Sequence, residues 1–426
     1  MPTRRLVRGF QPEITACTGA RYHRPPMLEP HRTHWPRIVC LWLCGVVAAM
    51  QFAKMALAFT AVQQWYGLSA AQMGIILSTV GLTGLVFGVT MGLYAHAIGY
   101  RRLLLTGLAL GAVLAALQAL MLPPFWLWAT RLLEGVSHLA VVVTAPTLIA
   151  AQCAPRQRSV AMGLWSTFVG VAFALTGAFG PSVLLGLGLN GLLGLHALAM
   201  AVMVGWVAAA VPADTDAFGV RAWPRWQAVP RHHLHIYTRW ETALPGLCFF
   251  CYTGMAVALL TFLPLQAGAN TPWLAVVLPL TGIAGTFSAG WLAQAWVTPL
   301  WLVRLAFAGV GLAGLGLWVC SAIGWDKAPA ALLLMYLAGL SGGAAFSLIP
   351  YLSHESLLQS RANGAVAQMG NLGATLGPPL FATLLAAWGV AGLTVPVVAL
   401  ALLGMAVASW GARQRARALQ ALMPSS

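Results

Sequence analysis

Charged residues are scarce in this chain of 426 residues, and acidic residues are the scarcest, with 8 Asp and Glu against 23 Lys and Arg. Asp, Glu, Lys and Arg together make up 7% of the sequence, whereas about 25% is usual for a soluble globular domain. Together with 60% hydrophobic residues, this deficit excludes a soluble fold. The sequence also lacks Gly-x-x-x-x-Gly-Lys-[Ser/Thr], the pattern of a nucleotide-binding P-loop, so no nucleotide-driven activity is predicted.

Cysteine is also infrequent, and its number, 7, is odd. The pairs Cys40/Cys44 and Cys248/Cys251 have helical spacing inside apolar segments, where cysteine usually acts as a small hydrophobe. We therefore expect no disulfide and no bound metal. The histidine cluster at residues 232–235 lies in a polar stretch without a further ligand nearby, and we interpret it as part of a solvated linker.

Long apolar segments dominate the remainder of the chain. A helix needs about 20 residues to cross about 30 Å of hydrocarbon. The sequence predicts an all-α polytopic membrane protein with twelve transmembrane helices, at residues 37–60, 71–94, 101–121, 125–149, 159–183, 191–211, 242–266, 272–295, 300–323, 328–352, 362–388 and 391–411.

The placement of the basic residues predicts the topology. Of the 23 Lys and Arg, twenty fall on the side of the N-terminus, Lys327 falls on the opposite side, and Lys54 and Arg131 lie within spans. Cytoplasmic loops carry the excess of Lys and Arg, so both termini are expected in the cytoplasm, with the protein in the cell inner membrane. The net charge of +15 is thus interpreted as a sign of topology, with the lipid bilayer rather than nucleic acid as the partner.

Two related halves are indicated by repeated residues. Gly84, Gly92 and His96 match Gly282, Gly290 and Gln294 at an offset of 198, and Gly180-Pro181 matches Gly377-Pro378 at an offset of 197. The predicted units are a disordered cytoplasmic segment at 1–36, a six-helix bundle at 37–211, a cytoplasmic linker at 212–241, a second six-helix bundle at 242–411 and a basic cytoplasmic tail at 412–426.

The reversal after the second span carries a family pattern. Gly92, Gly99, Arg101 and Arg102 are spaced as in the signature loop between helices 2 and 3 of the major facilitator superfamily, which this chain resembles. His96 stands where that pattern has an acid, so the inner gate is expected to lack a charge pair. Gly180-Pro181, near the end of span 5, resembles the helix-5 motif of antiporters in this superfamily. Close helix packing through small residues is an equally good interpretation of these glycines.

Ionisable residues within the spans form the first candidate site. Lys54 and Arg131 are each about six residues from a span end, roughly 9 Å deep, and Glu134 lies deeper on the same helical face as Arg131. One interpretation is a structural ion pair between the first and fourth spans. The other is a protonatable switch or a substrate-charge site, which also includes Gln51, because ionisable groups inside a membrane are functional by default.

Polar residues of the second half form the second candidate set. Tyr252, Tyr336, Gln368 and Asn371 lie in spans 7, 10 and 11, and neutral amides of this kind either bind a polar ligand or join helices. We expect Gln51, Lys54, Arg131 and Glu134 to form one charged wall of a cavity, facing Tyr252, Tyr336 and Gln368.

The resemblance implies a monomeric secondary transporter that works by alternating access, with a small-molecule substrate held between the halves, no cofactor and a proton gradient as the energy source. Few fixed charges and many aromatic residues favour export of an amphipathic molecule, such as a drug-like compound or a siderophore. Uptake of a small polar or anionic nutrient is the alternative. A membrane-embedded lipid-modifying enzyme is a remote alternative, because such an enzyme needs acids, histidines or metal ligands clustered at one membrane face, and the sequence shows no such cluster.

Overall fold

A computed structural model describes residues 32–154, 157–213, 234, 236–266, 271–353 and 356–422. Most of the predicted N-terminal segment and of the linker, with His232, His233 and His235, lie outside these residues. The helices of the first half are α1 (Trp35–Leu57), α2 (Phe59–Tyr66), α3 (Ala70–Ile98), α4 (Tyr100–Ala119), α5 (Pro124–Ala151), α6 (Arg158–Ser166) and α7 (Phe168–Ala210). Those of the second half are α9 (Trp240–Leu265), α10 (Thr271–Ala295), α11 (Pro299–Ala322), α12 (Ala328–Leu352), α13 (Ser356–Trp388) and α14 (Ala391–Leu422).

Ten of these helices are long and apolar enough to cross a membrane, within the part of the chain that the structure describes. The 43-residue α7 accounts for two spans, because Gly188, at φ 67° and ψ −172°, breaks it into two legs. The first leg continues α6. The remaining span is α13, which is more polar but packs against α3, α9 and α14. The predicted twelve-span, all-α fold is thus confirmed, with most span ends within a few residues of the helix ends.

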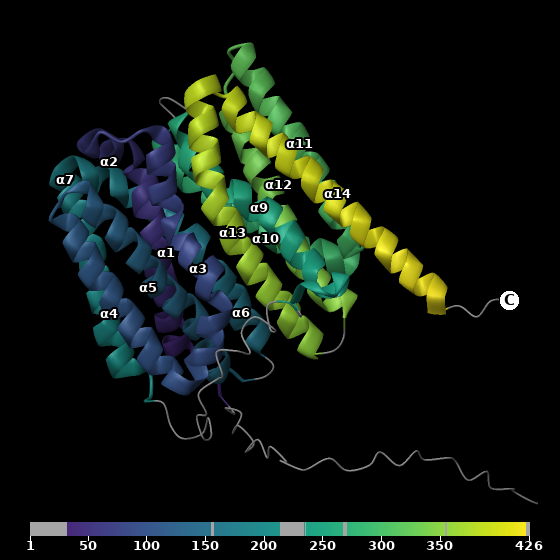
Figure 1. The fold of residues 1–426 in the computed structure, drawn as a ribbon, viewed down its shortest axis with the longest axis horizontal. Helices are drawn as coiled ribbons and strands as arrows, with labels where there is room; N and C mark the ends of the chain where they lie inside the picture. The colour runs from purple at the N-terminus through teal and green to yellow at the C-terminus, as the bar shows by residue number, and fades with distance from the viewer. Residues whose placement is uncertain are drawn as a thin grey trace, which may run out of the picture.

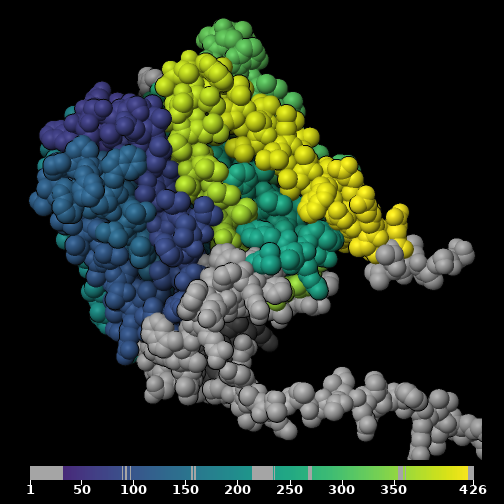
Figure 2. Space-filling model, viewed as in Figure 1, coloured from purple at the N-terminus to yellow at the C-terminus, as the bar shows by residue number. Residues whose placement is uncertain are grey.

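The helices form two bundles (Figure 1). In the first, α1, α3, α4, α5 and α7 pack on one another, and in the second α9, α11, α12, α13 and α14 do so, with α10 against α12. Between the bundles, α3 packs along α13 and α7 along α10. Figure 2 shows α13, in yellow-green, lying directly against the purple and blue surface of the first half.

Small residues make the contact between the halves close. A Cβ atom added at Gly84 of α3 would come within 2.5 Å of the Asn371 side chain of α13, and one at Gly74 within 2.6 Å of the Cα of Pro379. At one end of the interface, Phe59 of α2 and Phe262 of α9 form an edge-to-face pair with ring centroids 5.1 Å apart. The two halves therefore meet mainly through van der Waals contact.

The reversal between α3 and α4 takes place at Gly99 alone. Gly99 has φ +100°, which side chains rarely adopt, and it ends α3 and begins α4. Gly92 lies inside α3, so the prediction that both glycines form the turn is wrong: the helix continues to Ile98. The side chain of His96 lies outside the described part, so its role as a substitute for the acid stays a prediction.

Arg101 has a defined structural contact at this end of the bundle. Its Nε and one terminal nitrogen donate hydrogen bonds of 2.8 Å each to the carbonyl oxygens of Val211 and Ala208, at the C-terminus of α7. The last carbonyls of a helix lack partners within the helix and carry partial negative charge. Arg101 therefore caps α7 from the start of α4. Arg102 also interacts with a neighbouring group.

The two Gly-Pro pairs lie within helices. Pro181 is internal to α7, whose first leg continues to Gly188, and Pro378 is internal to α13. Gly377 brings the backbone of α13 against the carbonyl of Gly254 in α9, whereas Gly180 lies against the side chain of Leu57. The expectation that the Gly-Pro pair ends span 5 is corrected, and both glycines serve close packing.

The last helix is longer than a membrane span. With 32 residues, α14 measures about 48 Å at 1.5 Å per residue, against about 30 Å of hydrocarbon. Figure 1 shows its end, in yellow, projecting past the neighbouring helices. Arg415 stacks on the ring of Tyr351, at 3.7 Å from the ring centroid, which ties this part of α14 to the end of α12.

Candidate functional site

Three ionisable side chains meet inside the first bundle. Lys54 comes from α1, and Arg131 and Glu134 come from α5; the exposed fractions are 2%, 0% and 0%. Lys54 Nζ is 2.6 Å from Glu134 Oε1, and Arg131 Nη1 is 2.5 Å from Glu134 Oε2. The pairing of Arg131 with Glu134, predicted from their spacing of three, is confirmed. One carboxylate thus bridges two buried cations.

Arg131 uses its other donors on the backbone of neighbouring helices. Its guanidinium donates to the carbonyl oxygens of Ile76 and Leu77 in α3, each at 3.1 Å, and to that of Gln51 in α1 at 2.9 Å. These carbonyls lie in helix interiors. Each carbonyl oxygen has two lone pairs, so it can accept this hydrogen bond in addition to the one within its helix. Arg131 therefore joins α1, α3 and α5 at one level of the bundle.

Lys54 makes three hydrogen bonds, one for each of its N–H donors. The acceptors are Glu134, the side-chain oxygen of Gln118 in α4 at 2.9 Å, and Nδ1 of His196 in α7 at 3.1 Å. His196 Nε2 lies 3.0 Å from the carbonyl oxygen of Val47, which can only accept. Nε2 therefore donates, and Nδ1 is the neutral acceptor that faces Lys54.

The sequence did not single out Gln118 or His196. Each is a polar residue surrounded by apolar residues within a predicted span, and this position is the signal that could have found them. Gln118 Nε2 also donates to Glu134 Oε2, at 2.9 Å. The carboxylate thus receives hydrogen bonds from α1, α4 and α5, and the cluster, with the contacts of Arg131 to α3, joins five helices of one half.

Gln51 and His138 extend this cluster along α1 and α5. The amide of Gln51 donates to Ser137 Oγ at 3.1 Å, whereas its side-chain oxygen is buried without a hydrogen-bond partner in the described part of the chain. His138, one turn after Glu134, has Nδ1 at 3.2 Å from the carbonyl oxygen of Ala48, and its ring stands edge-on to Phe52. Ser137 and His138 were also absent from the predicted set.

The cluster has a surplus of positive charge. It contains two cationic side chains and one carboxylate, while His196 is placed as a neutral acceptor. Two further described acids are remote from it: Glu241 lies in the first turn of α9, and Asp326 caps the start of α12 through the amide of Ala328. Burying an unpaired charge costs free energy, so the surplus positive charge indicates a functional role for this cluster.

The predicted polar residues of the second half do not join the charged cluster. Gln368 accepts a hydrogen bond of 2.9 Å from Tyr237 and donates one of 3.5 Å to the carbonyl of Leu85 in α3. Asn371 packs against Gly84, and Tyr336 is half-buried in α12. The prediction that the charged residues face Tyr252, Tyr336 and Gln368 across one cavity does not hold in this conformation. The charged side chains point into their own bundle instead. A role for each residue in binding stays a prediction.

Tyr252 lies instead at a small pocket of about 60 Å³ between the two halves. The pocket is bounded by α6, α7, α9, α10 and α12, and no charged residue of the described chain lines it. Its walls combine hydroxyl groups with aromatic and sulfur-containing side chains, among them Ser166, Thr167, Tyr252, Thr286, Phe287 and Met335. This lining suits an uncharged, partly apolar group.

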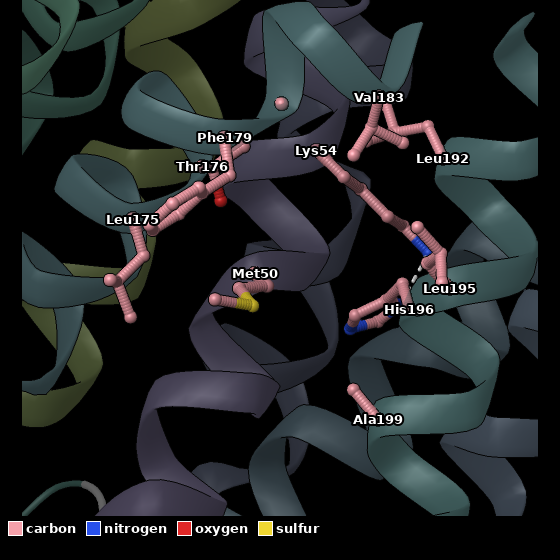
Figure 3. A pocket seen from close by; sticks show the side chains of 11 residues that line it. Met50, Lys54, Leu175, Thr176, Phe179, Val183, Leu192, Leu195, His196 and Ala199 are labelled. Atoms are coloured by element: carbon pink, nitrogen blue, oxygen red, sulfur yellow. Dashed lines mark hydrogen bonds between the residues drawn. The ribbon is translucent and has the colours of Figure 1, made fainter. Parts of the chain in front are cut away.

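A larger cavity of about 350 Å³ lies within the first half, between α1 and the two legs of α7. Figure 3 shows Met50 and Lys54 projecting from α1, with Leu175, Thr176 and Phe179 on one side and Leu192, Leu195 and His196 on the other. The wall is apolar except for Thr176, Lys54 and His196. The charged cluster thus borders this cavity rather than the space between the halves.

The fold and the buried cluster define a multi-pass helical membrane protein built from two bundles that meet along two helix pairs. The sequence matches the family model described as the Major Facilitator Superfamily over residues 41–378, and the chain belongs to that family. Family and fold point to a transporter rather than an enzyme.

Similar proteins of known sequence are transport proteins. The chain is 30% identical over 161 residues to the inner membrane transport protein YajR of Escherichia coli (strain K12), covering 37% of this chain and 34% of the relative. It is 28% identical over 144 residues to a gallate transporter of Pseudomonas putida, covering 34% and 32%. The matched part spans about a third of the length of each relative.

Similar solved structures include a bacterial homologue of the human lysosomal transporter Spinster. Its inward-facing, occupied form aligns with a TM-score of 0.69 at 13% identity, over 89% of this chain and 97% of that one. Its inward-facing, unoccupied form gives a TM-score of 0.66 at 15% identity, over 88% and 96%. At this identity the likeness shows the fold.

Proposed function

We propose that this protein is a proton-coupled secondary transporter of the cell inner membrane that exports small amphipathic molecules by alternating access. The family, the two-bundle fold and the transport proteins among its relatives support the transporter class. Direction, coupling and substrate rest on the physical arguments that follow.

The pocket at Tyr252 is the observation that carries the substrate class. It lies between the halves, where alternating access requires the substrate. Its lining offers hydroxyl groups beside Phe287 and Met335. The charged side chains of the buried cluster do not line this pocket. Polarisable, adaptable side chains such as Met suit ligands of varied shape. The chemistry of this lining therefore favours contact with an amphipathic molecule over a small anion, and the pocket of about 60 Å³ encloses only a part of such a molecule.

The contact between the halves supports alternating access. Along α3 and α13, and along α7 and α10, glycines such as Gly74, Gly84 and Gly177 bring backbone and side chains close. Van der Waals contact of this kind can be exchanged for another arrangement at low cost, whereas the hydrogen-bonded charges hold the first bundle together. Each half can then rock as a unit.

Proton coupling is assigned to the charged cluster. Protonation of Glu134 would remove the negative charge that holds Lys54 and Arg131, and so loosen the joint between α1 and α5. Because Arg131 also binds carbonyl oxygens of α3, the change would reach a helix that contacts the second half. A proton gradient could in this way bias the orientation of the halves.

Uptake of a small anionic nutrient is the second candidate. The surplus positive charge of the cluster favours an anion, and one relative is named as a gallate transporter. In this case the cluster itself would need to open toward the space between the halves.

Transport into sealed proteoliposomes tests the proposal. Under an imposed pH gradient, we expect a fluorescent amphipathic dye to move against the proton flow, and radiolabelled gallate to remain in place. Replacing Tyr252 with Phe removes one hydrogen bond to the substrate and should weaken apparent affinity about 5- to 150-fold, whereas Cys248→Ala is the matched control. Gradient-driven gallate movement without dye movement would favour uptake, and gradient-independent flux of both would refute proton coupling.

A further inference from the structure

The cavity between α1 and the two legs of α7 lies apart from the pocket between the halves. Its rim includes side chains that the protein leaves exposed, with exposed fractions of 36% for Leu175, 66% for Phe179 and 42% for Leu195. In a membrane-spanning bundle, exposed apolar side chains of this kind face lipid tails. The cavity is therefore a crevice that opens toward the bilayer.

The deepest polar groups of this crevice are Lys54 and His196 (Figure 3). Two of the three donors of Lys54 are held by groups that belong to the interior of the bundle, Glu134 and Gln118. The third is held by Nδ1 of His196, a neutral acceptor on the crevice wall. Lys54 thus presents its least strongly held donor toward the crevice.

We propose that this crevice binds a single-chain amphipathic carboxylate from the bilayer, with its carboxylate at Lys54 and its alkyl chain along α7. The carboxylate replaces Nδ1 of His196 as the third acceptor of Lys54. The Lys54–His196 hydrogen bond has an ionised donor only, whereas a carboxylate acceptor adds the attraction between two opposite charges. His196 keeps its hydrogen bond to the carbonyl of Val47 from Nε2.

Charge and volume favour this ligand. The cluster carries two cations and one carboxylate, so a ligand with a single negative charge makes it neutral. A cavity of about 350 Å³ holds on the order of ten methylene-sized groups, taking about 30 Å³ for each, the share of a water molecule in the liquid. This volume accommodates one alkyl chain. The inference goes beyond the proposed function, because it places a ligand within one half.

Binding can be measured without transport. The purified protein, in nanodiscs of a zwitterionic lipid, is titrated with radiolabelled laurate, and dodecanol is the uncharged competitor of equal chain length. A laurate carrying a diazirine near its chain end is then crosslinked, and the modified residues are identified by mass spectrometry. We expect laurate to bind at least tenfold more tightly than dodecanol, with crosslinks on Leu175, Phe179 and Leu192.

Two variants test the location and the charge. Ala199→Phe fills the crevice without altering the charged cluster and should abolish the crosslinks, whereas Ala201→Phe, exposed on the same leg of α7, should leave them unchanged. Lys54→Met leaves the neutral pair of Arg131 and Glu134 and should bring laurate affinity down to that of dodecanol.

Equal binding of laurate and dodecanol by the unmodified protein would overturn the charge pairing. Crosslinks that persist in Ala199→Phe, or that spread evenly over the lipid-facing helices, would overturn the site. Neither result depends on whether the protein transports a dye or gallate, so failure of this inference is distinguishable from failure of the proposed function.

Discussion

Glu134 neutralises one of two cations that are both removed from solvent, and this makes the three charges unequal in their contribution to stability. Removing the carboxylate leaves two buried charges of the same sign, whereas removing Lys54 leaves a neutral pair. Breaking a buried pair by removing one partner typically costs 3–5 kcal/mol. The second buried cation therefore makes Glu134 the most important of the three charges for folding.

We therefore predict that Glu134→Gln lowers stability by about 3–5 kcal/mol, while Lys54→Met costs about 1–2 kcal/mol or less. The melting temperature of each purified variant, followed by intrinsic fluorescence in the same detergent, measures the difference. Arg304→Met, at a position outside the cluster, is the control for loss of a positive charge. Equal destabilisation by Glu134→Gln and Lys54→Met would contradict the unequal roles.

Tyr237 has a residue-level role that is independent of the charged cluster. Burial raises the pKa of its hydroxyl group to about 12, so the group stays protonated and can donate to Gln368. A group whose pKa is raised in the folded state stabilises the fold fully below its unfolded pKa, about 10 for tyrosine, and loses that contribution as the pH rises toward 12.

Tyr237→Phe should accordingly cost about 1 kcal/mol at every pH between 6 and 9. The measurement is the melting temperature of the variant and of the unmodified protein across that range. A difference that disappears as the pH is raised from 6 to 9 would show that the tyrosine ionises earlier than its burial indicates.

At the scale of helices, the junction of α3 and α4 depends on one backbone conformation. Gly99 has φ +100°, and Arg101 directly afterwards caps α7, so the angle at Gly99 also places the guanidinium. An L-residue with a side chain is strained by roughly 1–2 kcal/mol in such a conformation.

Gly99→Ala should thus destabilise the protein by about 1–2 kcal/mol, whereas Gly88→Ala, in the same helix with open space around it, should be neutral or stabilising by up to about 1 kcal/mol. Urea denaturation monitored by circular dichroism separates the two variants. Arg101→Lys provides a further comparison, since it keeps the charge and loses the two-point cap. If the two glycine variants behave alike, the backbone at Gly99 is not the cause.

The helices themselves could be predicted from the sequence, because each span is a long apolar run ended by polar residues or by glycine. Two errors have physical reasons. Gly92 was assigned to the reversal because glycine permits a turn, yet the helix continues past it to Ile98. The polar partners Gln118 and His196 were missed because their contacts join helices that are distant in sequence, and no local spacing reports such contacts.

For the whole molecule, the packing of Asn371 against Gly84 is the contact that can be altered with the least damage to either half. The atoms nearest to a Cβ at Gly84 belong to the Asn371 side chain, at 2.5 Å, whereas a Cβ at Gly74 would meet the backbone of Pro379 at 2.6 Å. A side chain can be shortened by mutation, and a backbone cannot. The two positions therefore differ in whether a second substitution can restore the contact.

Gly84→Ala should reduce transport at least tenfold by disfavouring the arrangement of halves described here, and Asn371→Ala should restore most of that loss. Gly74→Ala should reduce transport similarly, and Asn371→Ala should not restore it. Initial rates in proteoliposomes measure the four variants, with melting temperatures as a check on folding. Rescue of both glycine variants, or of neither, would show that the contact between α3 and α13 does not act through these atoms.

The projecting end of α14 offers a physical handle on the conformational cycle. Because the helix is continuous with the second bundle and held there by the stacking of Arg415 on Tyr351, a reorientation of that bundle turns α14 as a lever. A fluorophore attached to its far end would travel farther than any atom near the pocket. Energy transfer to an acceptor on the first bundle could then record single turnovers as steps in distance, even before the transported molecule is known.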